Sequence, residues 1–178
     1  MKKYLVAALL LLAFSLPCCC HGQILRQNDP DTGERNIVSM INTGHRSVKK
    51  VFRKQLNPNG ARYFVEVLVY TDMVLCFKPA GTLTVDLTTL NFPVSSKALR
   101  KGNDEDIISV ATLELSSEVV AYLSKARGMF FGVTVDGARF YNEKEYYLGA
   151  DLSEFGQLGL VWNDDDFAEV QRTAVAEW

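Results

Sequence analysis

Histidine is scarce in this sequence, and its scarcity removes one large class of catalytic site. Of the two histidines, His21 lies in the N-terminal segment, which leaves His45 in the body of the chain. Any Ser-His or Cys-His arrangement would depend on His45, which lies in a polar Gly-His-Arg-Ser stretch without a local catalytic signature. We interpret His45 as a surface residue of a turn, and we predict that the protein is not an enzyme.

The spacing patterns of metal and nucleotide sites are also absent. There is no H-E-x-x-H, no paired C-x-x-C, no EF-hand spacing and no glycine-rich phosphate loop after a strand. Two acidic clusters, at 104–106 and 164–166, offer oxygen ligands for calcium. Adjacent carboxylates do not all point at one ion, and helix capping or solvation explains both clusters. We therefore predict no metal and no cofactor.

An excess of charge of one sign is missing. The chain has 19 Lys and Arg against 21 Asp and Glu, for a formal net charge of −2, so we expect no nucleic-acid partner. One local exception lies between residues 46 and 54. Its basic residues form a weak candidate for anion binding, and a solvated face is the alternative. These residues are Arg46, Lys49, Lys50, Arg53 and Lys54.

Cysteine is distributed in a way that leaves the body of the chain without a disulfide. Cys18, Cys19 and Cys20 are adjacent, and Cys76 is the fourth. Once an N-terminal segment containing the first three is removed, Cys76 has no partner, so the core has to hold without a cross-link. Cys76 lies in an apolar run, which indicates core packing rather than a nucleophile.

The sequence does contain an export signal over residues 1–22. Lys2 and Lys3 precede an apolar run from Leu5 to Leu16, which is shorter than the roughly 20 residues that a spanning helix needs. Such a segment predicts that the chain works outside the cytoplasm.

The end of the signal has two competing interpretations, besides a signal that is not cleaved at all. In the first, Leu16-Pro17-Cys18-Cys19 loosely resembles a bacterial lipobox, with Cys18, Cys19 or Cys20 acylated and the protein anchored to a membrane of the cell envelope. In the second, an ordinary signal peptidase cuts after Gly22 and releases a soluble periplasmic or extracellular protein.

The remaining residues fit one folded domain preceded by an arm. Hydrophobic residues make up 48% of the sequence, and no repeat or low-complexity segment is present. Residues 23–56 are polar with turn chemistry and predict a tether or arm, and residues 57–178 predict a β-rich globular domain.

Alternation of apolar and polar residues predicts antiparallel strands. A run over 63–70 indicates a central strand that forms a hairpin with 73–77, and 82–88 indicates a half-exposed strand with Leu83, Val85 and Leu87 on its buried face. If 82–88 lay at a sheet edge, another protein could add a strand there. Further strands are predicted over 107–115 and 129–135, the latter turning at Asp136-Gly137 into 138–141.

A short strand near 145–148, a helical segment over about 153–158, two further helices and one long connection complete the pattern. A helix capped by Ser116 or Ser117 places Val119, Val120, Leu123 and Ala126 on one stripe and closes near Gly128. A terminal helix after Asn163 turns Phe167, Val170 and Ala174 inward. Residues 91–106 are predicted to form a polar connection.

The sequence therefore predicts a mainly β (or α+β) fold: a single antiparallel β-sandwich or partly open barrel with one or two short helices. For function it favours an exported, lipid-anchored cell-envelope protein with a non-catalytic binding or structural role and a protein partner in the envelope. A secreted carbohydrate- or calcium-binding module is one alternative, and a carboxylate-dependent hydrolase is another.

Overall fold

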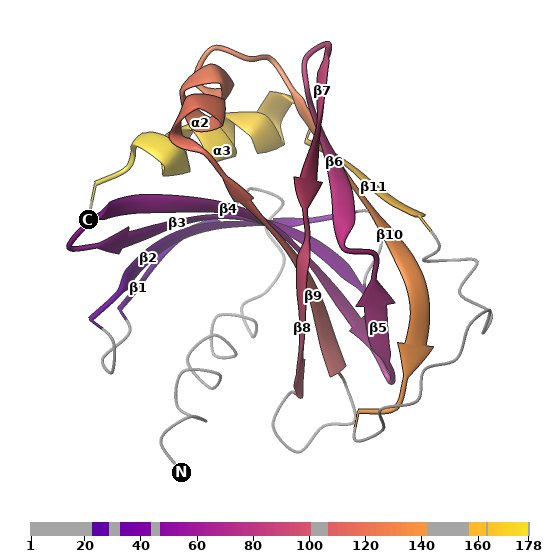
Figure 1. The fold of residues 1–178 in the computed structure, drawn as a ribbon. Coiled ribbons are helices and arrows are strands. Elements are labelled where there is room, and N and C mark those ends of the chain that lie inside the picture. Colours follow the sequence, from indigo (N-terminus) through magenta and orange to yellow (C-terminus); the bar gives the residue numbers. More distant parts are fainter. Residues whose placement is uncertain are drawn as a thin grey trace.

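In the part of the chain that the structure describes, the fold is mainly β, with two antiparallel sheets, two short helices and no closed barrel (Figure 1), which confirms the predicted fold class in its sandwich-like form. The computed structural model describes residues 23–28, 33–43, 47–100, 107–141, 157–162 and 164–177. The larger sheet has the strand order β1 (Gln23–Asn28), β2 (Arg35–Asn42), β3 (Val48–Asn57), β4 (Gly60–Thr71), β9 (Ile107–Leu115) and β8 (Ser95–Arg100). The smaller sheet has the order β11 (Gln157–Trp162), β10 (Met129–Arg139), β6 (Ala80–Val85) and β7 (Thr88–Pro93), and β5 (Val74–Phe77) pairs with β10.

The arm predicted over residues 23–56 is wrong, because these residues supply three neighbouring strands of the larger sheet. β1 pairs with β2, and β2 pairs with β3 over eight residue pairs, from Arg35↔Leu56 to Asn42↔Lys49. Both β2 and β3 bury apolar side chains, which are Ile37, Val38, Ile41, Val48, Val51 and Phe52. Basic residues between these positions obscured the alternation. The predicted signal peptide, 1–22, lies outside the described residues.

The turn and the central strand predicted next are confirmed. Asn57 pairs with Gly60 at the β3–β4 hairpin, and the Asn57 side-chain oxygen accepts a hydrogen bond from the backbone N–H of Asn59 at 2.9 Å. Gly60 has a φ of +128°, a conformation that side-chain-bearing residues rarely adopt. β4 then lies between β3 and β9 and is buried from Phe64 to Val69.

Two predicted hairpins are wrong, because the true strand partners lie elsewhere in the chain. β5 pairs with β10 rather than with β4. β10 continues through Asp136-Gly137 instead of turning there, and it pairs with β6 and β11 before it pairs with β5. The register shifts between Val135 and Gly137, so the Asp-Gly pair lies at a β-bulge.

The predicted connection over 91–106 is replaced by strands as far as residue 100, and 101–106 lie outside the described residues. β7 pairs with β6 in the smaller sheet, and β8 pairs with β9 in the larger one. Val94 is the one residue between them, and its N–H donates to the Pro79 carbonyl at 2.9 Å. The chain therefore passes from one sheet to the other through a nearly continuous strand (Figure 1).

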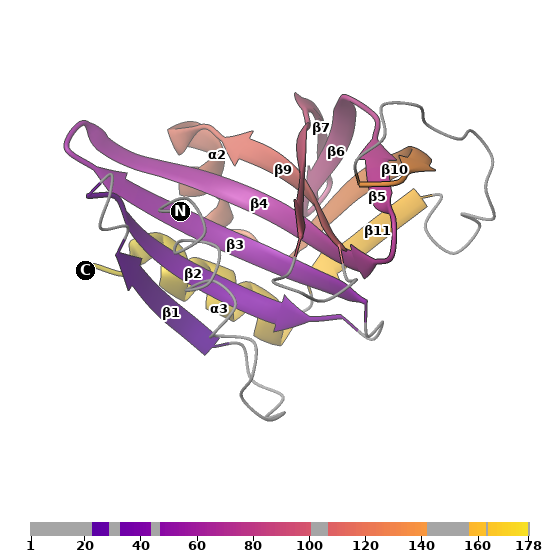
Figure 2. The same ribbon diagram turned by 90° about the horizontal axis from the view of Figure 1, so that it is seen from below.

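The helices predicted after Ser116 and after Asn163 form, and their predicted inner faces are confirmed. The helical segment predicted over 153–158 is wrong at its end, because Gln157 and Leu158 belong to β11. The rest of that segment and the strand predicted over 145–148 lie outside the described residues. The Ser116 hydroxyl caps α2 (Ser117–Leu123) by accepting from the Val119 N–H. This helix ends at Leu123, before the predicted stop at Gly128. α3 (Asp164–Val175) packs against β2 and β3 (Figure 2). Leu123, Ala126, Phe167, Val170 and Ala174 all join the main core between the two sheets.

Candidate binding surface

The basic segment does not form one cluster, because a strand directs alternate side chains to opposite faces. Lys50 and Lys54 lie on the face of β3 that carries Phe52, toward α3. Lys49 and Arg53 lie on the other face with Val51. Arg46 is outside the described residues. The structure therefore does not bring the candidate anion-binding residues together.

Lys54 binds the C-terminal end of α3. Its ammonium donates to the carbonyls of Ala174 and Ala176 at 2.9 and 2.8 Å. These carbonyls lack helical partners, and a cation near them is favourable. Burial lowers the pKa of Lys54, and the Glu177 carboxylate partly opposes this.

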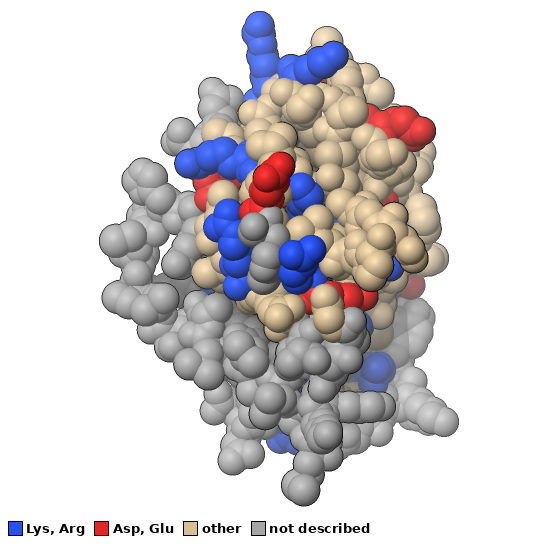
Figure 3. All heavy atoms as spheres, turned by 90° about the vertical axis from the view of Figure 1, so that its left-hand side faces the viewer, with Lys and Arg blue, Asp and Glu red and all other residues tan. Residues whose placement is uncertain are grey.

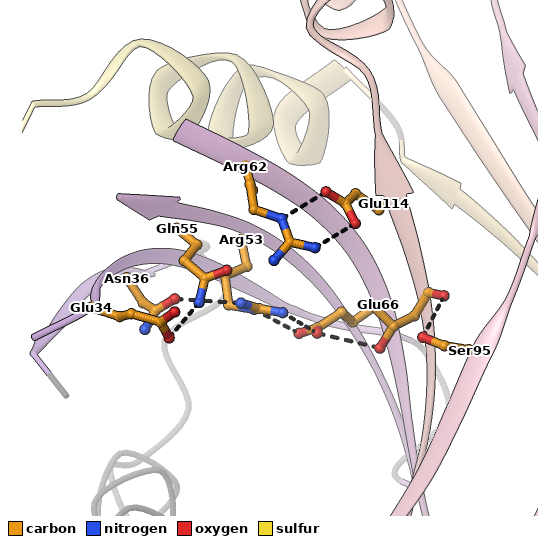
Figure 4. Close-up of polar contacts among 9 residues, drawn as sticks. Glu34, Asn36, Arg53, Gln55, Arg62, Glu66, Ser95 and Glu114 are labelled. Carbon is orange, nitrogen blue, oxygen red and sulfur yellow. Dashed lines mark hydrogen bonds and ion pairs between the residues drawn. The ribbon is translucent and has the colours of Figure 1, made fainter. Parts of the chain in front are cut away.

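Arg53 is held in a polar network on the outer face of the larger sheet (Figure 4). Its guanidinium donates to both Glu66 oxygens, at 2.8 and 3.3 Å, and to the Asn36 side-chain oxygen. It also lies 4.1 Å from the centre of the Phe64 ring. This network joins β2, β3 and β4. The Arg53 guanidinium is thus paired with protein groups and does not form an open anion site.

A second ion pair continues the network toward the solvent. Arg62 donates two hydrogen bonds to Glu114, at 2.7 and 2.8 Å, and its guanidinium lies 5.2 Å from the centre of the Phe64 ring. The Arg62 guanidinium holds the pKa of the Glu114 carboxyl below its usual value. Among the described residues on the side of the molecule seen in Figure 3, acidic side chains lie between and beside the basic ones.

Most of the other residues singled out in the sequence lie outside the described part of the chain. Cys18, Cys19, Cys20 and His45 lie outside the described residues, and Cys76 is a half-buried free thiol on β5. In the part of the chain that the structure describes, no three His, Cys, Asp or Glu side chains are placed to hold a metal ion.

An apolar groove lies between α2 and the β6–β7 hairpin. It has a volume of about 300 Å³. Its walls are formed by Val85, Thr88 and Leu90 from the hairpin and by Glu118, Val119 and Tyr122 from the helix. Leu90 is 37% exposed and Tyr122 is 45% exposed, although both are large apolar side chains. The groove therefore presents apolar side chains to the solvent.

The hairpin beside the groove is fixed by Asp86. Its side-chain oxygen accepts the N–H groups of Arg127 and Gly128 at 2.9 and 3.2 Å. Asp86 has a φ of +52°, which is unusual for a residue other than glycine and is compensated by these bonds. Leu87 follows and is fully exposed, so the prediction that it shares the buried face of Leu83 is wrong: the strand ends at Val85.

β7, rather than the strand predicted over 82–88, forms an exposed edge of the smaller sheet. β6 lies between β10 and β7 and has no free side. β7 pairs with β6 alone among the described strands, and Thr88 to Asn91 are exposed. Sequence patterns missed this edge because it is polar and ends at Pro93, which argues against a strand.

The groove also escaped prediction, since α2 and the hairpin are joined only by long-range contacts. The exposure of Leu87 and Tyr122 would indicate an apolar surface in this region, but the sequence alone does not reveal which apolar residues are exposed.

Within the described residues, no helix has the length and apolar character needed to cross a bilayer. Comparison with protein-family models, with curated proteins and with solved structures finds no match to this chain.

Proposed function

We propose that this chain is an exported, lipid-anchored protein of the cell envelope whose role is non-catalytic binding. The observation that carries the binding role is the apolar groove between α2 and the β6–β7 hairpin, with Leu90 and Tyr122 exposed at its walls. The basic and apolar start of the chain, followed by three cysteines, supports export and anchoring.

The composition of the groove favours binding over catalysis. Its wall residues are mainly apolar, and Glu118 is the one charged residue among them. Such a surface binds by releasing water from apolar groups, and the polar groups orient the partner. The Glu66 carboxylate lies on a strand, and that of Asp86 lies next to one. Glu66 forms an ion pair with Arg53, and Asp86 accepts hydrogen bonds from backbone N–H groups. The partner that fits is an apolar segment of another envelope protein.

Photocrosslinking in intact cells tests the binding site. A photoreactive residue is placed at Glu118 or at Tyr122, which line the groove on α2, and a control is placed at exposed Asn59 in the β3–β4 turn. We expect one discrete adduct from both groove positions and none from the control. Equal labelling at all three positions, or no adduct at the groove, would contradict the proposal.

Intact mass of the native protein tests the anchor. A chain that begins at Cys18, Cys19 or Cys20 and carries acyl groups is the expected result. An unmodified chain that begins at Gln23 in the soluble fraction would refute the anchor and leave a diffusible binding protein.

A further inference from the structure

β7 is unusual among the sheet edges because it is both uncharged and exposed. β5, which pairs with β10 alone among the described strands, is also uncharged, but its side chains are mostly buried. Exposed edges are normally guarded by charged residues or proline, which prevent pairing with other chains. Among the edges whose side chains the structure describes, β1 carries Arg26, and β8 carries Lys97 and Arg100. β7 reads Thr-Thr-Leu-Asn-Phe-Pro, so Pro93 at its end is its one guard. The first four residues of β7 are therefore open to another strand.

The short turn before β7 determines which backbone groups are open. Val85 pairs with Thr88 across a two-residue turn, and such a pair exchanges the hydrogen bonds of the ladder. Because the pattern alternates, Thr89 and Asn91 direct their N–H and C=O groups away from β6. The hydroxyls of Thr84 and Thr89 lie 2.9 Å apart, as expected for the closely spaced pair between hydrogen-bonded ones.

We propose that a second copy of this chain pairs with β7 through these open groups, with the two strands antiparallel. When Leu90 lies on the two-fold axis, Thr89 lies opposite the partner subunit's Asn91, and the same contact repeats on the other side. A register centred nearer to Pro93 lacks an N–H donor. The uncharged strand brings no like charges together when it meets itself, and the net charge of −2 adds little repulsion.

The pairing also gives the groove a second wall. Leu90 lies both on the proposed axis and in the groove, so the partner subunit's Leu90 lies next to it and the two grooves meet at the interface. This shared binding site rests on the proposed function, whereas the pairing itself does not. A strand of six residues makes a small interface, so we expect a reversible dimer with a micromolar dissociation constant.

Sedimentation velocity with charged variants tests the register. The purified chain is expected to dimerise as its concentration rises from micromolar to millimolar. T89K/N91K places lysine opposite lysine at both contacts, and T89E/N91E places glutamate opposite glutamate. Each variant should raise the dissociation constant at least about tenfold. Mixing the two variants should restore a dimer with one copy of each, and Ser96→Lys on β8 should leave the dissociation constant unchanged.

A wild-type chain that stays monomeric at millimolar concentration overturns the pairing, as does a mixture in which the dimer is not restored. Circular dichroism of each variant tests whether it is folded. Unfolded variants would not form a dimer when mixed, so a restored dimer also excludes unfolding as the cause of the lost pairing. If the dimer is absent while adducts at Tyr122 persist, the pairing fails and the proposed function stands. If adducts are absent while mixing restores the dimer, the pairing stands and the proposed function fails.

Discussion

Replacement of Lys54 by methionine tests whether one buried ammonium holds the last helix against the sheet. The Lys54 side chain is almost fully buried, and it donates to two carbonyls at the end of α3. Methionine keeps most of the apolar stem and removes the charge and both donors. The change therefore isolates the hydrogen bonds from the packing.

The expected loss of stability follows from these contacts. A hydrogen bond to a charged group contributes about 1.5–3 kcal/mol, and two are lost. Burial disfavours the charged form of Lys54 and lowers its pKa, which offsets part of that gain. We expect the free energy of unfolding to fall by about 2 kcal/mol, which corresponds to a decrease in Tm of about 4–8 °C for a chain of this size.

Urea denaturation and amide hydrogen exchange measure the effect. Lys97→Met is the control, because Lys97 is exposed on β8 and its loss should change stability by less than about 0.5 kcal/mol. Lys54→Met should also accelerate exchange in α3 more than in β4. Equal destabilisation by the two variants, or unchanged exchange in α3, would refute the reasoning.

Three further changes probe the outer network, the hairpin and the buried phenol. Arg53→Met leaves the Glu66 carboxylate buried without its guanidinium and should cost about 2–3 kcal/mol in urea denaturation, whereas Arg62→Met at the exposed pair should cost less than about 1 kcal/mol; similar values would contradict the difference in burial. Asp86→Ala removes two hydrogen bonds in a strained turn and should cost about 1–3 kcal/mol, and Asp86→Asn, which keeps an acceptor oxygen, should cost less. Burial raises the pKa of Tyr70 above its usual value of 10.0, so only the unfolded chain loses that proton just above this pH, and stability falls as the pH rises. Tyr70→Phe should reduce this alkaline loss, and an unchanged pH profile would count against it.

Strong local patterns in the sequence were sufficient to predict the central elements. The strand around Val67 is buried on both faces, and the helices expected to bury Leu123 and Phe167 do so. In each case the local signal and the tertiary environment agree, since a continuous apolar run or a helical stripe has few other ways to leave water.

The strands near the N-terminus were missed because charged side chains occupy inward positions. Lys50 and Lys54 are buried on the side of β3 on which α3 packs, whereas charged residues were expected to be exposed to solvent. Lys54 is tolerated there because the end of a helix, distant in sequence, supplies acceptors. A single sequence gives no indication of that distant partner.

Turn signals were ambiguous for a different reason. Asn59-Gly60 forms the expected hairpin, whereas Asp136-Gly137 lies at a bulge in an unbroken strand. Whether such a pair forms a turn or a bulge depends on whether the residues beyond it find a neighbouring strand. Beyond Asp136-Gly137, β10 pairs with β5. The groove beside Tyr122 depends on similar long-range packing and was likewise beyond local patterns.

The position of α3 has a consequence for the order in which the chain folds. Phe167 and Val170 fill the core over strands that lie more than one hundred residues earlier, and Lys54 reaches Ala174 across 120 positions. A growing chain therefore keeps the inner face of β2 and β3 uncovered until residues 164–175 have been synthesised. Such a delay leaves the hairpins of the larger sheet, which are local in sequence, to form before their inner face is covered, and the core closes only after the last helix has joined the sheet.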